Sequence, residues 1–269
     1  MIAVNDGRKR PRYSSGGHDP TLARTQSGEV ALYVNPSEYG LITPKNGSVG
    51  VSKDGEEWYP SILNNGRLTA FIPGNPGAGK SYLANELIEL LPPDYKILLF
   101  TSVDEFDGNF EGLKDRLYKI RMEPENLQRM TLATIRSVCD HPILLFDDVD
   151  KIRNKKVEEL VFKLMEDALA NGRDHRHHDG KRDIHVICTS HALNDYRKTK
   201  YTLENSDYVA LFPQSTTYMQ MKRLFDKLGL SKELCDKVIE VGKRGEVRRV
   251  IIHKVTPMYI IIGDKIALI

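Results

Sequence analysis

The residue types between positions 74 and 81 are those that a bound triphosphate needs. The segment reads Gly-Asn-Pro-Gly-Ala-Gly-Lys-Ser. Glycines let the backbone curl so that successive N–H groups point at phosphate oxygens, and a following helix adds free N–H groups and its dipole. We expect Lys80 to reach the β- and γ-phosphates and Ser81 to ligate Mg²⁺ through its hydroxyl. The predicted nucleotide-binding residues are Gly74, Asn75, Pro76, Gly77, Ala78, Gly79, Lys80, Ser81 and Tyr82.

Two adjacent acids follow a second apolar run. Residues 143–146 are Ile-Leu-Leu-Phe, and Asp147 and Asp148 come directly after them. Ligands bind outside the carboxyl ends of parallel strands, so we expect Asp147 to hold Mg²⁺ through water and Asp148 to orient and activate the attacking water. Many motor ATPases carry Glu at the second position, so the shorter Asp148 has to sit closer or act through a relay. A solvated loop carboxylate is the alternative for Asp148, and Asp150 is assigned to the surroundings of the site or to the surface.

A third apolar run, residues 184–188, ends in Thr189, Ser190 and His191. In P-loop motors the strand beside the catalytic acid often ends in a polar residue that senses the γ-phosphate. A hydroxyl or an imidazole can donate a hydrogen bond to a phosphate oxygen, so all three residues are candidates. The spacing does not choose among them, and a polar strand end without a role is the alternative.

Residues 172–182 form a charged segment flanked by glycines, which reads Gly-Arg-Asp-His-Arg-His-His-Asp-Gly-Lys-Arg. Arg173, with Arg176 as second choice, is predicted to be an arginine finger that reaches a neighbouring subunit's γ-phosphate; such a residue contributes about 10³–10⁵ in rate. A basic loop on a nucleic-acid backbone and a solvated surface loop are the alternatives. The histidines do not predict a metal site, because metal ligands need fixed elements and supporting partners.

Strands and helices that alternate from residue 67 onward have to position these groups. An apolar strand, 68–73, enters the triphosphate loop and an amphipathic helix, 81–91, leaves it, which argues against an ordinary glycine-rich turn. Further strands are predicted at 95–101, 143–146, 184–189 and 208–212, with two or three in 247–269, and further helices at 157–170, 219–228 and 231–241. This alternation predicts an α/β fold with a mainly parallel sheet flanked by helices, and the loop at 74–81 makes it a P-loop NTPase core.

Three segments are predicted along the chain. Residues 1–28 form a flexible basic arm, residues 29–66 a β-rich leader, and residues 67–269 the P-loop core with its C-terminal strands. The arm contains Arg8-Lys9-Arg10-Pro11-Arg12, which is either a nuclear-import signal or nucleic-acid tail, or a solvated end. A second basic cluster, Lys243 to Arg249, either faces a phosphate backbone or forms a charged strand edge that discourages aggregation.

The composition is that of an ordinary folded domain. A net charge of +2 means that any nucleic-acid contact has to come from local basic patches. The three cysteines, Cys139, Cys188 and Cys235, are not spaced as metal ligands and favour a reducing compartment. No run approaches the ~18 apolar residues of a membrane span, and the N-terminus lacks a signal-peptide core, so no membrane span is expected.

In order and type, these motifs resemble those of the DNA-packaging ATPases of large double-stranded DNA viruses (poxvirus-type), in the FtsK–HerA superfamily. The resemblance covers residues 67–212 and rests on the loop at 74–81, the strand at 97–101, Asp147-Asp148, Gly172-Arg173 and the strand end at 186–191. It implies a RecA-like core, Mg-ATP hydrolysis, a pentameric or hexameric ring of identical subunits, and pumping of double-stranded DNA into a preformed capsid. Relatives often carry Gln where this chain has Ser190-His191, so His191 is expected to substitute as the sensor.

The resemblance also implies partners and locations. Capsid or portal-vertex proteins are the expected partners, in the host cytoplasm (viral factory) or the virion, with the host nucleus reached through the basic arm. Another DNA-translocating or phage-assembly P-loop ATPase is an alternative, although assembly ATPases often carry a membrane span. A small-molecule kinase fits less well, because it needs no acid pair at Asp147 and Asp148 and uses an arginine-rich lid in cis. A non-enzymatic nucleotide-binding scaffold is a further alternative.

Overall fold

The computed structural model describes most of the chain from residue 67 onward. The described ranges are 67–102, 108–173, 183–191, 196–245, 247–255 and 258–263, with residues 109 and 196–198 described by backbone alone. Backbone alone is also described for the short strands β1 (Ile2–Val4), β2 (Thr21–Thr25), β3 (Val30–Val34), β4 (Trp58–Pro60) and β13 (Lys265–Leu268).

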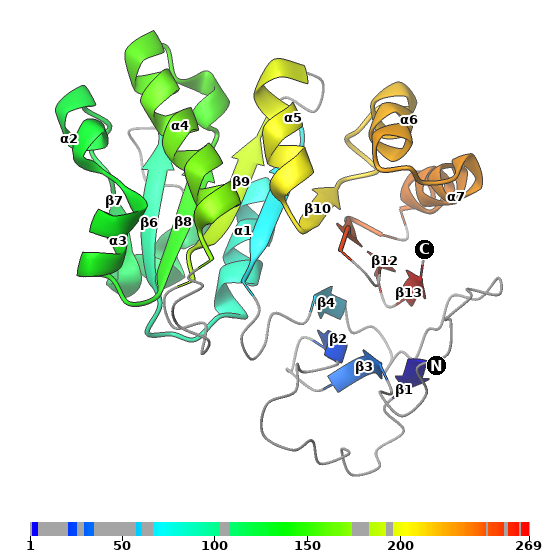
Figure 1. The fold of residues 1–269 in the computed structure, drawn as a ribbon. Coiled ribbons are helices and arrows are strands. Elements are labelled where there is room, and N and C mark those ends of the chain that lie inside the picture. The colour runs from blue at the N-terminus through cyan, green and yellow to red at the C-terminus, as the bar shows by residue number, and fades with distance from the viewer. Residues whose placement is uncertain are drawn as a thin grey trace.

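The strands of the core form one sheet of nine within the described residues, in the order β13-β12-β11-β10-β5-β9-β8-β6-β7 (Figure 1). Their bounds are β5 Thr69–Pro73, β6 Lys96–Thr101, β7 Leu117–Lys119, β8 Pro142–Asp147, β9 His185–Ser190, β10 Tyr208–Leu211, β11 Val250–His253 and β12 Tyr259–Ile262. Strands β10, β5, β9, β8, β6 and β7 pair in parallel, whereas β11, β12 and β13 extend the sheet from β10 as an antiparallel run. The predicted α/β core with a mainly parallel sheet is confirmed.

The lengths of the connections fit the pairing within the parallel run and within β11, β12 and β13, whereas β11 lies antiparallel to β10 although α6 and α7 separate them in the chain. Parallel neighbours need a crossover of a dozen or more residues, and helices supply it between β5 and β10. Only a few residues join β11 to β12 and β12 to β13, so these strands can pair only as hairpins.

The helices predicted from hydrophobic periodicity are all present. The described helices are α1 Lys80–Glu89, α2 Pro124–Arg129, α3 Leu132–Val138, α4 Lys155–Asn171, α5 Tyr196–Asn205, α6 Tyr218–Lys227 and α7 Lys232–Lys243, with 3₁₀ segments η2 Gly108–Arg116 and η3 Val149–Lys151. Side chains fix two of the starts: Asn154 accepts the N–H groups of Lys156 and Val157 at α4, and Thr217 and Gln220 form a capping box at α6. Helices α2, α3 and α5 were not predicted.

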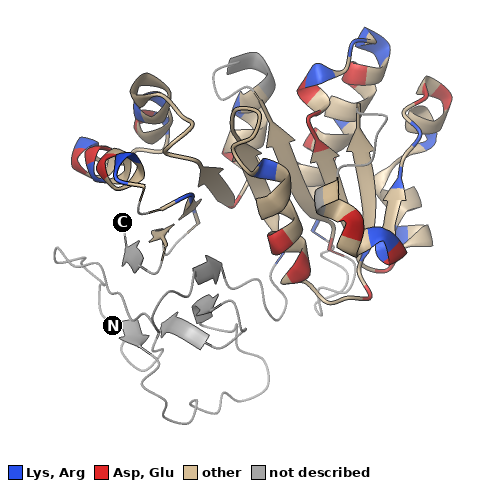
Figure 2. Cartoon of the chain, turned by 180° about the vertical axis from the view of Figure 1, so that it is seen from behind, with Lys and Arg blue, Asp and Glu red and all other residues tan. Residues whose placement is uncertain are grey.

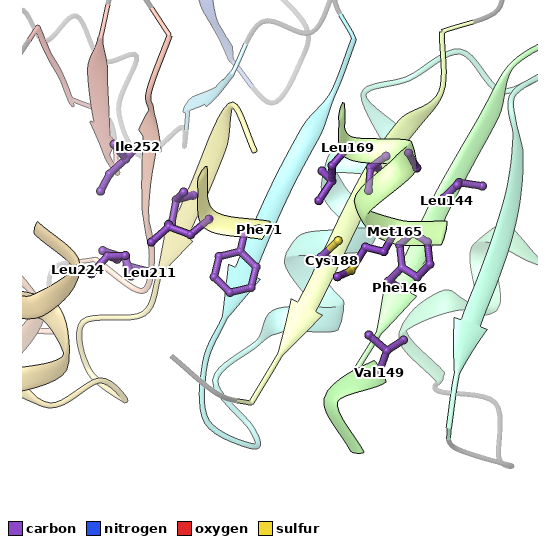
Figure 3. Packing of buried hydrophobic residues seen from close by; sticks show 14 of the residues in the cluster. Phe71, Leu144, Phe146, Val149, Met165, Leu169, Cys188, Leu211, Leu224 and Ile252 are labelled. Atoms are coloured by element: carbon purple, nitrogen blue, oxygen red, sulfur yellow. The ribbon is translucent and has the colours of Figure 1, made fainter. Parts of the chain in front are cut away.

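Successive side chains along each strand point to opposite faces of the sheet, so a hydrophobic core forms on each face. Phe71, Phe146 and Cys188 point to the face that α4 covers, where Met165 and Leu169 pack onto them (Figure 3). The intervening residues of the same strands point to the other face, which α1 and η2 cover; this second core includes Ala70, Ile72, Leu145, Ile187, Leu83, Leu87 and Phe110. Each fully buried large side chain stabilises the fold by about 1.5–3 kcal/mol.

Charge is kept out of the centre of the sheet. Among β5, β8, β9 and β10, Asp147 at the end of β8 is the single Lys, Arg, Asp or Glu. Figure 2 shows charged residues mainly on the helices and connections around these strands. A strand that is buried on both faces tolerates a charge only where it serves a site, so Asp147 marks one. None of the described helices is long and apolar enough to cross a membrane.

A second, antiparallel sheet lies near the N-terminus. Its strands are ordered β1-β3-β2-β4, and β4 contacts β12 (Figure 1). Two of these strands, β1 and β2, lie within residues 1–28, the predicted flexible arm, and β3 lies within the predicted β-rich leader. The basic residues 8–12 lie outside the described residues, and the segment boundaries stay predictions.

Candidate active site

The sheet order brings the three predicted motifs to one edge. Strand β9 lies between β5, which leads into the triphosphate loop, and β8, which ends at Asp147. All three strands are parallel, so their carboxyl ends point to the same side. A hydrogen bond of 2.9 Å from the Gly74 N–H to the Ser190 carbonyl joins the loop to the end of β9. The polar end of β9 is thereby placed between the loop and the acid pair.

The loop has the backbone geometry of an anion cradle. Gly77 and Gly79 have φ angles of 76° and 101°, in the region that favours glycine. Gly79 caps α1 without a side-chain hydrogen bond to the helix start, so the first N–H groups of α1 face the loop without a protein cap. Free N–H groups and a helix dipole together favour phosphate binding, which is the role predicted for this segment.

Lys80 is held beside Asp148. Its side chain is 6% exposed, and its Nζ lies 3.7 Å from Asp148 Oδ1 and 3.4 Å from His191 Nδ1. Burial lowers the pKa of Lys80, while the carboxylates of Asp148 and Asp147 act to raise it. A buried ammonium at the mouth of the loop is a strong electrostatic partner for phosphate oxygens.

Thr189 ties the two acids to β9. Its hydroxyl donates to Asp147 Oδ1 at 2.7 Å and accepts the Asp148 N–H at 3.0 Å. The Thr189 side chain is buried, with 1% exposed. A buried hydroxyl that both donates and accepts fixes its partners closely, so Thr189 acts here as the residue that positions the acids.

Asp148 adopts a left-handed conformation that directs its carboxylate at His191. Its φ of 49° is the only positive φ of a non-glycine residue in the described part of the chain. The Asp148 Oδ2 lies 2.5 Å from His191 Nε2 and 3.7 Å from Lys151 Nζ. A non-glycine residue in this conformation costs about 1–3 kcal/mol and persists where the surroundings hold it, which is typical of active sites.

His191 links the acid to the loop lysine. Its Nε2 donates to Asp148, its Nδ1 faces Lys80, and its backbone N–H donates to Asp150 Oδ2 at 3.2 Å. Ser190 contributes its carbonyl to the loop, and Thr189 contacts the acids. Of the three sensor candidates, His191 alone contacts both Lys80 and Asp148.

Comparison with known proteins decides the family. Residues 70–207 match the family model described as "ATPase family associated with various cellular activities (AAA)". The chain belongs to this AAA family. As an AAA ATPase it binds ATP and hydrolyses it.

The AAA ATPase is similar to a viral protein. It is 29% identical over 207 residues to "Uncharacterized protein V3" of the Sputnik virophage, covering 75% of this chain and 76% of that protein. Among solved structures, the cytoplasmic domain of the Thermomonospora curvata type VII secretion ATPase EccC is 13% identical, with a TM-score of 0.45 over 86% of this chain. The pCW3 conjugation coupling protein TcpA is 9% identical, with a TM-score of 0.44 over 82% of this chain. The match spans 31% of the EccC chain and 64% of the TcpA chain.

The AAA ATPase offers oxygen donors suited to Mg²⁺. Asp147 is 7% exposed at the end of β8, with Thr189 bonded to one of its oxygens, and Ser81 is half-buried at the start of α1. No group of three or more His, Cys, Asp or Glu able to hold a metal occurs among the described residues. Mg²⁺ uses one or two protein ligands together with water and substrate phosphates, so this donor set fits it.

Arg173 lies near the amino-terminal end of β9, opposite the end that faces the triphosphate loop. Gly172, directly before it, accepts the Ile184 N–H at 2.9 Å, and Arg67 at the start of β5 bonds the Ile184 carbonyl at 2.7 Å. Strand β9 runs about 20 Å from that edge to Ser190. The AAA ATPase therefore does not bring Arg173 to its own triphosphate loop, and any catalytic role for it requires a second subunit. Arg176 and the histidines of this segment lie outside the described residues.

Arg248 lies against the triphosphate loop and was not predicted as a site residue. A Cβ placed on Gly79 would lie 3.4 Å from Arg248 Nη2, and the Arg248 Cζ is 5.9 Å from the Tyr82 ring centroid. In the sequence Arg248 is one member of a basic cluster far beyond residue 81. Only the pairing of β11 with β10 brings it beside the loop, so no local pattern could have identified it.

Proposed function

We propose that this AAA ATPase is a ring motor that translocates double-stranded DNA and packages a viral genome into a preformed capsid. The observation that carries the proposal is the separation of Arg173 from the triphosphate loop of its own chain. Subunits arranged head to tail in a ring bring the edge of one sheet near the loop of the next, so that a neighbour's arginine completes each site.

The motif order supports the choice of cargo. The triphosphate loop, the acid pair, Gly172-Arg173 and the polar strand end occur in the order found in the packaging ATPases that the chain resembles. The similarity to a virophage protein supports a viral setting. Capsid or portal-vertex proteins are the proposed partners, and the host cytoplasm or the virion is the proposed location.

The hydrolytic step is assigned to residues at the start of α1 and at the ends of β8 and β9. The N–H groups of the loop and Lys80 orient the triphosphate, and Ser81 and Asp147 would hold Mg²⁺, which would supply positive charge to offset that of the phosphate oxygens. Asp148 accepts a proton from the attacking water as its oxygen bonds to the γ-phosphorus, and ADP leaves with the electrons of the broken P–O bond. His191 holds the Asp148 carboxylate in position through the 2.5 Å contact to Oδ2.

The proposal is tested by measuring ATP hydrolysis at increasing concentrations of linear duplex DNA, with the mass of the assembly determined in parallel. Duplex DNA is expected to raise the rate severalfold, and a non-hydrolysable ATP analogue is expected to favour a ring of five or six subunits. Single-stranded DNA of equal nucleotide concentration is the control. If saturating duplex DNA leaves the rate unchanged and the protein stays monomeric with nucleotide, the motor assignment is wrong.

A further inference from the structure

The segment before β11 lies beside the triphosphate loop. Arg248 lies in this segment, and its guanidinium is the nearest group to the free side of Gly79, with Nη2, Cζ and Nε at 3.4, 3.6 and 3.6 Å from a Cβ placed there. The flat guanidinium therefore lies against the loop backbone. Because Gly79 carries no side chain, the two can approach this closely.

The backbone that carries Arg248 is held on both sides. Arg249, which is 8% exposed, pairs with Glu86 of α1, which is 12% exposed. The Val247 carbonyl accepts a hydrogen bond from Gln214, and Val250 pairs with Leu211 at the end of β10. A side chain on a fixed backbone loses less freedom when it binds a ligand, which favours affinity.

The charge of Arg248, unlike the charges of Arg244 and Arg249, is unpaired within the described residues. Arg249 pairs with Glu86, and Arg244 pairs with Glu240. Arg248 is solvent-exposed and instead faces the ring of Tyr82, which is 48% exposed in the first turn of α1. An exposed guanidinium beside a phosphate-binding loop is placed to meet an anion.

The sheet order tells which part of the nucleotide Arg248 meets. Strand β5 has β9 and then β8 on one side, and Asp148 and His191 follow the ends of these two strands. On its other side lie β10 and then β11. The groups that act on the γ-phosphate therefore approach from the β9 side. Arg248 approaches from the β10 side, so it reaches the nucleoside end of the molecule rather than the γ-phosphate.

We propose that Arg248 binds the α-phosphate of the nucleotide in cis, with the Tyr82 ring beside the ribose and base. This inference rests on the ATPase site alone and not on DNA translocation. Since ATP and ADP share the α-phosphate, Arg248 contributes equally to the affinity for both. It acts on binding rather than on the chemical step, because it does not lie near the hydrolysed bond.

The affinities of fluorescent ATP and ADP analogues test this in the absence of DNA. Arg248→Gln is expected to weaken both by about tenfold or more, as expected for a lost charge-assisted contact, and to raise KM with kcat nearly unchanged. Arg248→Lys is expected to restore part of the affinity, and Arg244→Gln in the same basic cluster to leave it unchanged. Thermal unfolding checks that the exposed substitution does not alter folding.

Two outcomes would overturn the inference. Unchanged affinity of Arg248→Gln for both nucleotides would show that Arg248 does not bind the nucleotide. Loss of ATP affinity with ADP affinity intact would place Arg248 at the γ-phosphate. Either result is independent of whether duplex DNA stimulates hydrolysis.

Discussion

At the scale of single residues, the site depends on a few short contacts between β8, β9 and α1. Lys80, Asp148 and His191 lie within contact of one another, and Thr189 fixes both acids. This arrangement gives the shorter Asp148 the support that a longer Glu would not need: His191 and the left-handed backbone together aim its carboxylate.

Asp148→Asn separates binding from hydrolysis. The amide keeps the size of the side chain but cannot accept a proton, so the rate of ATP hydrolysis is expected to fall by about 10²–10⁴. ATP affinity is expected to stay within about threefold of the wild type, because the loop is untouched. Steady-state kinetics and equilibrium binding measure the two effects, and hydrolysis at the wild-type rate would exclude Asp148 as the base.

Thr189→Val removes the hydroxyl while keeping the shape of the side chain. Asp147 then loses a donor and the Asp148 N–H loses an acceptor, so the free energy of unfolding is expected to drop by about 1–3 kcal/mol. Hydrolysis is expected to slow as well, because Thr189 no longer holds the two carboxylates in position. Thr189→Ser is the matched control and should retain most of both properties; equal losses in the two variants would contradict this role.

At the scale of elements, most strands and helices of the core could be predicted from the sequence. The apolar runs of β5, β8 and β9 and the long periodic helices α1 and α4 were predicted, because each has a strong local pattern. Helices α2 and α3 have 6 and 7 residues, too few to show a period, and α5 is mostly polar. The position of Arg248 depends on strand pairing, which no local pattern encodes.

The start of β9 carries a buried histidine whose charge state should limit acid stability. His185 Nδ1 accepts the Leu68 N–H at 3.0 Å, and burial, with Arg67 nearby, lowers the pKa of His185 from 6.5 to about 3. Between these pH values the unfolded chain binds a proton that the folded chain does not. The free energy of unfolding is therefore unaffected by protonation of His185 above pH 6.5. Below that pH it falls by about 1.4 kcal/mol per pH unit, down to about pH 3.

His185→Asn should remove that dependence. The Asn side-chain oxygen can still accept the Leu68 N–H, but the group no longer titrates. Denaturant unfolding of both proteins between about pH 7 and pH 4 is expected to give a stability difference that changes with pH by the slope above. Parallel curves across this range would show that His185 is not the group responsible.

At the scale of the whole molecule, the two edges of the sheet have different roles. The carboxyl ends of the parallel strands carry the triphosphate loop, and Arg173 lies beside the opposite end of β9, about 20 Å away along that strand. Among the described residues the site therefore contains its loop, its acids and its sensor candidate, but not its predicted finger. The proposed head-to-tail assembly would bring Arg173 of one subunit to the loop of the next.

Mixing two inactive proteins tests the shared site. Arg173→Ala is expected to lower hydrolysis by about 10³-fold or more, and Asp148→Asn subunits are inactive but keep their finger. A mixture of the two should regain activity, because an Arg173→Ala site receives its arginine from an Asp148→Asn neighbour. Arg121→Ala, at an exposed surface position, is the control. A mixture no more active than its components would contradict a finger supplied in trans.

Displacement of a triplex-forming strand tests the central claim most directly, because it reports movement along duplex DNA rather than hydrolysis alone. The wild-type protein is expected to displace a third strand bound to linear duplex DNA, at a rate that depends on ATP. Asp148→Asn is expected to bind ATP and leave the third strand in place. Rapid ATP hydrolysis by the wild type in the presence of the duplex, with no displacement of the third strand, would contradict the account.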